Sequence, residues 1–182
     1  NPPFMGQTQI SGHLGGAYRD WLFMIQERSG GKSDLVAHFF RRAAMLIGAH
    51  GTIGLIATNT IGQGDTRQSG LQVLLSQGFI IYAATASRTW PQPGAAVHVA
   101  VVHLAQGTAR AHVPPPVLGF GSNARVVEAI SSRLRGKPER PDPRPLSSNA
   151  GLSFLGSKIG GQGFTFDDDD PEATPVSEAA RL

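Results

Sequence analysis

The sequence predicts an α/β protein whose sheet ends in an antiparallel hairpin. Hydrophobic patterning gives the order helix, helix, strand, helix, strand, strand over residues 17–105. The apolar run GTIGLIATN, bounded by glycine, is typical of a buried strand covered on both faces. The short loop SRTWPQPG between the last two β-type runs suits antiparallel neighbours. Because three strands cannot complete a sheet that buries such a strand, the pattern corresponds to the second half of a larger sheet.

The chain is expected to begin as a loop and then form a helix. Residues 1–16 are rich in glycine, proline and small hydroxyl residues, which favour irregular structure. Residues 17–28 place Trp21, Met24 and Ile25 at i, i+3 and i+4, the spacing of an apolar helix face. The following SGGKS is expected to end this helix.

The second helix, DLVAHFFRRAAMLI at 34–47, has the clearest signals. Ser33 and Asp34 are candidate caps, and Gly48 and Gly51 mark its end. The side chains expected along one side are Leu35, His38, Phe39, Arg42 and Leu46.

The remaining elements of the first part follow in alternation. A strand is expected at 51–59, with function expected at its carboxyl end. A third helix at 66–78 carries a leucine stripe and ends at a glycine. Strands at 79–86 and 95–105 complete the hairpin.

Three consecutive prolines near residue 115 indicate a boundary. The expected domains are therefore 1–113, a second unit beginning at 117–166, and an acidic tail, 167–182, expected to be disordered. Within the second unit, helical periodicity occurs only in RVVEAISSRL at 125–134, and SFLGSKIGGQGFTF at 153–166 predicts two strands joined by a glycine-rich loop.

Composition limits the function. No cysteine is present, which excludes disulfides, thiolate metal sites and a cysteine nucleophile, and no apolar run of about 18 residues predicts a membrane span. Up to Phe166 the chain carries 15 of its 16 Lys and Arg but 7 of its 13 Asp and Glu. This basic body suggests a polyanionic partner, with a solvated basic surface as the alternative. No metal site is expected, because His98 and His103 are five residues apart and would face opposite sides of a strand.

The opening tetrapeptide, NPPF, has the groups to bind a planar ring that carries an amino group. Two prolines keep the backbone stiff, so that the Asn1 amide oxygen and the Pro2 carbonyl can converge on one NH₂ group. Phe4 offers a flat face for stacking. Adenine and cytosine are such rings; the alternative is an ordinary proline-rich turn with one buried phenylalanine. Because translation starts with methionine, Asn1 also predicts a fragment or a processed product.

The motifs together resemble the adenine-N6 DNA methyltransferases, which use S-adenosylmethionine. The resemblance rests on NPPF followed by DLVAHFFRRA, HGTIGLIATNTI and TWPQPGAAVHVAVVHL, over residues 1 to about 105. In addition, AISSRL and DPRPLSSNAGLSFLGSKIGGQGF resemble the segment leading into the target-recognition region of large single-chain restriction-and-modification enzymes. The resemblance implies the C-terminal half of a Rossmann-like methyltransferase sheet, a duplex DNA partner, a nuclease domain in the same parent chain and a cytoplasmic location of bacterial type.

The resemblance also implies roles for residues around the target base. Asn1 and the carbonyl of Pro2 would accept hydrogen bonds from the adenine N6 amino group. Phe4 would stack on the flipped base, and Trp90 would hold it from the other side or the edge. For Trp90, a turn packed on the sheet edge is the structural alternative.

Two residues are expected near the cofactor. Phe39 would pack against the adenine ring of S-adenosylmethionine, and Pro3 would lie near the cofactor as well. For Phe39, a role in the hydrophobic core is the alternative. The chain departs from the family in lacking the glycine-rich cofactor loop, so its activity without further sequence is in doubt.

Other functions remain open at this point. A methyltransferase acting on RNA or on protein glutamine can carry a similar tetrapeptide, and a DNA-binding fragment without catalysis would use residues 117–166. In a circularly permuted methyltransferase, GFGSNARVVEAI would be the cofactor loop running into a helix.

Overall fold

The structure is a computed structural model with two compact units, Asn1–Pro141 and Asp142–Leu182. The expected strand pair at 153–166 lies, apart from residue 166, outside the described residues, as does most of the acidic tail. The described residues are 1–90, 97–143, 146–147, 166, 168–169 and 175–177.

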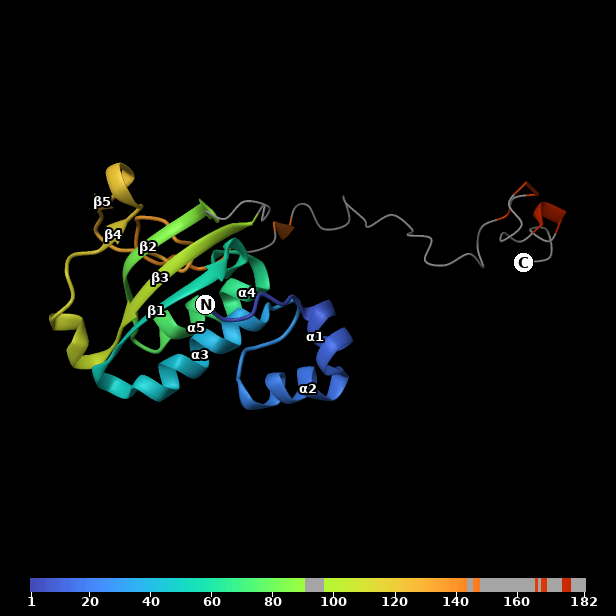
Figure 1. The fold of residues 1–182 in the computed structure, drawn as a ribbon, viewed down its shortest axis with the longest axis horizontal. Coiled ribbons are helices and arrows are strands. Elements are labelled where there is room, and N and C mark those ends of the chain that lie inside the picture. The colour runs from blue at the N-terminus through green and yellow to red at the C-terminus, as the bar shows by residue number, and fades with distance from the viewer. Residues whose placement is uncertain (91–96, 144–145, 148–165, 167, 170–174, 178–182) are drawn as a thin grey trace. The chain divides into compact units, whose positions relative to one another are not determined.

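A five-stranded sheet forms the centre of the first unit, in the order β1-β3-β2-β4-β5 (Figure 1). Strand β3 is antiparallel to both of its long neighbours, β1 and β2, so these two run parallel to each other. The strands expected at 51–59, 79–86 and 95–105 and their antiparallel hairpin are confirmed. The bounds are β1 Thr52–Thr58, β2 Ile80–Thr89, β3 His98–Ala105, β4 Val117–Leu118 and β5 Arg125–Val126.

The helices α3, α4 and α5 cover one face of this sheet, whereas α1 and α2 lie beside α3, away from the sheet (Figure 1). The core between helices and sheet contains Phe40, Leu71 and Leu74 on the helix side and Val102 and Leu104 on β3. The bounds are α1 Gln7–Leu14, α2 Gly16–Ile25, α3 Leu35–Ile47, α4 Gly64–Ser69 and α5 Leu71–Ser76.

The amino-terminal helix α1 contradicts the loop expected over residues 1–16. Its sequence, QTQISGHL, has little intrinsic helix preference because serine and glycine interrupt it. Its one buried residue, Ile10, packs with Leu22 and Leu35. Tertiary packing therefore forms a helix that local propensity does not predict.

Helix α3 confirms the predicted cap and end. The Asp34 side chain accepts a hydrogen bond from the Val36 N–H, and the helix ends at Gly48. The sheet packs against Val36, Phe40 and Ala44, at i, i+4 and i+8. Phe39, on the side of the helix predicted to carry Leu35, His38 and Arg42 as well, is 41% exposed.

The helix expected at 66–78 is two helices, α4 and α5, separated at Gly70. A Cβ at Gly70 would lie 2.9 Å from the Thr66 carbonyl oxygen and 3.1 Å from the Ala37 Cβ. A side chain here would clash with the local Thr66 carbonyl and press on helix α3, so glycine is favoured. The leucine periodicity does not reveal this break.

Strand β1 is not covered on both faces within the described part of the chain. Ile53 and Ala57 are buried under the helices, whereas Thr52 and Gly54 on the opposite face are exposed. This alternation is typical of an antiparallel strand with one open face. β1 also pairs with β3 alone among the described strands.

The segment after the three prolines packs with the sheet. Strand β4 pairs with β2, and Ile130 and Leu134 enter the core. The helix expected at 125–134 is wrong: this stretch begins with β5 and continues without a helix. The glycine-rich turn before it therefore leads into a strand, unlike the cofactor loop of the permuted alternative. The assignment of residues 117–166 to a target-recognition domain stays a prediction.

No helix within the described ranges is long and apolar enough to cross a membrane.

Candidate functional site

The residues of the opening tetrapeptide differ in their exposure to solvent. Asn1 and Pro3 are exposed, Pro2 is buried and Phe4 is half-buried. The Asn1 side chain makes no hydrogen bond with the other described residues and is open to a ligand.

Asp34 anchors the end of this tetrapeptide to the start of α3. The Met5 N–H donates to Asp34 Oδ1 at 3.2 Å, and the Met5 carbonyl accepts from the Leu35 N–H at 2.8 Å. The same Oδ1 accepts from the Val36 N–H at 3.1 Å. Sequence reasoning identified Asp34 as a cap; its second role, holding the residue after NPPF, depends on contacts between distant residues.

The anchor continues to the carboxyl end of β1. The Asp34 N–H donates to Thr66 Oγ1 at 3.0 Å. Thr58 is the last residue of β1, and its Oγ1 lies 3.5 Å from Asp34 Oδ2. The tetrapeptide is therefore fixed near the end of the strand where function was expected.

A second link joins the carboxyl ends of β1 and β2. Asn59 directly follows β1; its amide nitrogen donates to Ser87 Oγ at 3.0 Å, and its amide oxygen accepts from the Ser87 N–H at 2.9 Å. Ser87 lies in a β-bulge and has a φ of 57°, an unusual conformation for a residue with a side chain. Sequence reasoning missed this pair, although a polar residue directly after an apolar strand is the signal that could have found Asn59.

Trp90 lies at the same end of the sheet. It directly follows β2 and is half-buried, and its N–H donates to the Val97 carbonyl at 2.9 Å across the hairpin. The parallel strands β1 and β2 thus bring the NPPF anchor and Trp90 to one edge. The residues between Trp90 and Val97 lie outside the described part of the chain.

Phe39 lies in a pocket between α2 and α3 rather than in the core. The pocket has a volume of about 310 Å³. Its walls are mostly apolar, with three polar side chains. The lining residues are Tyr18, Trp21, Leu22, Ile25, Gln26, Leu35, His38, Phe39 and Arg42.

His38 and Gln26 are buried polar residues at this pocket. The His38 Nδ1 lies 2.8 Å from Gln26 Oε1, and Gln26 Nε2 donates to the His38 carbonyl at 3.3 Å. Burial, followed by the nearby charge of Arg41, lowers the pKa of His38 to about 4, against the opposing effect of Asp34. The buried Nε2 has no hydrogen-bond partner within the described ranges.

The two strand histidines are placed apart. His98 is exposed at the start of β3, and the His103 ring packs on Tyr82 at a centroid distance of 5.7 Å. Among the residues that the structure describes, no group of three or more His, Asp or Glu is placed to hold a metal ion.

Comparisons with known proteins identify the fold and the family of the chain. A solved structure of the Type IIL restriction-modification enzyme MmeI in complex with DNA has a similar fold, with a TM-score of 0.62 and 23% identity. The match covers 77% of this chain and 19% of that enzyme chain. No curated protein matches the chain. The sequence model of the family described as "MmeI, DNA-methyltransferase domain" matches residues 1–113, and the chain therefore belongs to this family of restriction-modification methyltransferases.

Proposed function

We propose that the chain contributes the base-binding side of an S-adenosylmethionine-dependent DNA methyltransferase that modifies adenine N6 in a flipped-out base. The observation that supports this most is the anchored tetrapeptide. Met5 is fixed to Asp34 on one side of NPPF, while the Asn1 side chain stays open to a ligand. The sheet order β1-β3-β2, with β3 antiparallel to both, agrees with the C-terminal half of a Rossmann-like methyltransferase sheet.

Asn1 and the Pro2 carbonyl would bind the amino group of the base. Two acceptors converging on an NH₂ group draw its lone pair out of conjugation and direct it toward the methyl donor. The stiff Pro2-Pro3 backbone keeps both acceptors in place before the base arrives, so that little order is lost on binding. No proton-moving side chain is required for the transfer itself, because alignment and exclusion of water lower the barrier.

The flipped base would be held between aromatic side chains. Phe4 is half-buried beside the anchor, and Trp90 is half-buried at the same end of the sheet. Stacking on such rings offsets the loss of base stacking in the duplex, which amounts to a few kcal/mol. The basic body of the chain would neutralise the DNA phosphates.

The adenine ring of S-adenosylmethionine would occupy the pocket at Phe39. Phe39 is 41% exposed, Tyr18 and Trp21 supply further aromatic surface, and the other lining residues are mostly apolar. When bound, the cofactor supplies an electrophilic methyl group. Pro3, which is exposed, is proposed to face the same molecule.

The identity of the product tests this proposal. The longest natural chain that contains these residues is incubated with S-adenosylmethionine carrying a labelled methyl group and with duplex DNA, RNA or protein. We expect N6-methyladenine in the duplex DNA, identified by mass spectrometry of the digested nucleosides. Label on RNA, on a glutamine side chain or on cytosine would contradict the proposed substrate.

A further inference from the structure

A short loop beside α4 concentrates positive charge on the surface. We call residues 131–140 the basic loop. Its sequence, SSRLRGKPER, contains four cationic residues and one acidic residue. Arg135, Lys137 and Arg140 are exposed. The loop follows the residues matched by the family model, which ends at residue 113.

The single acidic residue of the basic loop, Glu139, is exposed, and its carboxylate contacts Ser132 and Arg67. Glu139 Oε2 accepts from the Ser132 N–H at 2.6 Å, and Oε1 accepts from Ser132 Oγ at 2.8 Å. Arg67 of α4, only 4% exposed, donates to Ser132 Oγ at 3.0 Å and lies 3.8 Å from Glu139 Oε1. Glu139 therefore compensates a buried arginine and does not neutralise the exposed cations.

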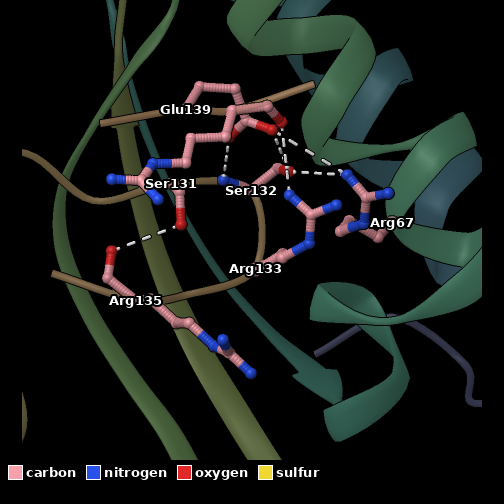
Figure 2. A network of polar contacts seen from close by, with 7 residues as sticks. Arg67, Ser131, Ser132, Arg133, Arg135 and Glu139 are labelled. Atoms are coloured by element: carbon pink, nitrogen blue, oxygen red, sulfur yellow. Dashed lines mark hydrogen bonds and ion pairs between the residues drawn. The ribbon is translucent and has the colours of Figure 1, made fainter. Parts of the chain in front are cut away.

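Within the described ranges, the outer cations Arg135, Lys137 and Arg140 have no comparable carboxylate partner. Figure 2 shows Arg135 extending away from the Glu139 carboxylate. The two ion pairs recorded among the described residues are Arg19–Asp20 and Arg67–Glu139, so neither includes an outer cation of the basic loop. Uncompensated charges on one loop are a strong attractor for a polyanion.

The basic loop is held in one conformation. Leu134 is buried with a φ of 53°, and its N–H donates to the Ser131 carbonyl at 2.8 Å. A Cβ at Gly136 would lie 2.7 Å from Val127 Cγ1, so the backbone here packs directly on its neighbour. A left-handed leucine is strained and persists where the surrounding packing enforces it.

Helix α4 connects the basic loop to the anchor of the tetrapeptide. Thr66 accepts from the Asp34 N–H, and the next residue, Arg67, holds Ser132 and Glu139. The basic loop also touches the turn after β1, since a Cβ at Gly62 would lie 3.3 Å from Leu134 Cγ. The exposed cations and NPPF are thus attached to the same end of β1.

We propose that the basic loop binds the phosphate backbone of duplex DNA beside the flipped base, with Arg135 and Lys137 as phosphate contacts. The inference rests on the proposed function, because it takes DNA as the polyanion. Phosphate contacts set the orientation of a protein on the duplex without reading its sequence. A rigid loop is suited to this role because its cations need little ordering on binding.

Salt-dependent DNA binding by the full chain tests the inference. Anisotropy of a labelled duplex is measured over a series of NaCl concentrations for the wild type, for Arg135→Ala with Lys137→Ala, and for Arg110→Ala. Arg110 is an exposed arginine on a turn that packs at the opposite end of β1, beside residues 48–50. Each phosphate contact contributes about 0.9 to the slope of log affinity against log salt. We expect the double variant to lose about 2 from this slope and to bind about 10-fold or more weakly, whereas Arg110→Ala changes the slope little.

The outcomes separate this inference from the proposed function. If the wild type binds DNA and the double variant keeps the wild-type slope, the basic loop is not a phosphate contact. The proposal of methyl transfer to DNA would stand in that case. If the wild type does not bind duplex DNA, the inference and the DNA partner both fail. Circular dichroism and the melting temperature of the double variant verify that it is folded. A smaller salt slope then reports lost phosphate contacts and not unfolding.

Discussion

At the scale of single residues, His38, which lines the pocket, makes the stability of the fold depend on pH. Its ring is buried between α2 and α3 and is bound to Gln26 at the end of α2. Because its pKa is lowered to about 4, the folded chain keeps the ring neutral over a range in which the unfolded chain takes up a proton near pH 6.5.

The sign of the pH dependence follows from this difference. Between pH 6.5 and about 4 the unfolded chain binds more protons, so His38 makes the folded state less stable as the pH falls through this range. The effect amounts to about 3 kcal/mol at most and is absent above pH 6.5. We expect His38→Asn, whose amide can still donate to Gln26, to lose less stability than the wild type between pH 7 and pH 4.5 in urea unfolding.

The matched control is His112→Asn, because His112 is exposed. This variant should follow the wild-type pH dependence. An equal loss of stability in the wild type and in His38→Asn would show that the buried ring does not carry the effect.

At the scale of elements, the start of α3 positions the tetrapeptide. One carboxylate, Asp34, serves the helix through Val36 and the NPPF segment through Met5. The cap was predictable because an Asp before an apolar helix is a local signal. The contact with Met5 was not, since it joins residues 29 positions apart.

Removing Asp34 should release the tetrapeptide. In Asp34→Ala, α3 loses its cap and the Met5 N–H loses its acceptor, which together should lower the free energy of unfolding by about 1–3 kcal/mol. Faster hydrogen exchange at the Met5 amide should accompany this loss. Asp34→Asn keeps an acceptor, so its free energy of unfolding should lie between those of Asp34→Ala and the wild type.

Asp20→Ala is the control, because Asp20 takes part in an exposed ion pair with Arg19. Such pairs contribute about 1 kcal/mol or less. The positioning role of Asp34 would be wrong if exchange at Met5 were the same in Asp34→Ala and in Asp20→Ala.

The errors of prediction at this scale have a common physical origin. The apolar spacing of Val127, Ile130 and Leu134 resembles a helix, and the latter two do enter the core. They do so from an irregular chain, because the left-handed backbone at Leu134 and the polar contacts of Ser132 fix the basic loop. A periodic pattern reports which residues are buried, and the contacts between distant segments decide the conformation.

At the scale of the whole first unit, the parallel ends of β1 and β2 gather the parts of the site. Asp34 holds the residue after NPPF, and Trp90 directly follows β2. Arg67 of α4 holds the basic loop through Ser132. The three long strands and the hairpin were predictable from apolar runs and turn residues, whereas the order of the strands in the sheet was not. The pocket around Phe39 was not predictable from the helical pattern, which left a place in the core open, because it depends on the packing of α2 beside α3.

The central claim is that Asn1 binds the amino group of a target adenine. Its most direct test is the methylation rate of duplex DNA by the longest natural chain containing these residues, compared for wild type, Asn1→Ala and Asn123→Ala. Asn123 is an exposed asparagine in the turn at 121–123, so its variant controls for the loss of a surface amide. Asn1→Ala is predicted to lower kcat by about 100-fold or more, the scale of removing one positioned polar group from a reacting centre, while Asn123→Ala retains the wild-type rate. A folded Asn1→Ala chain that methylates adenine at the wild-type rate would contradict the account.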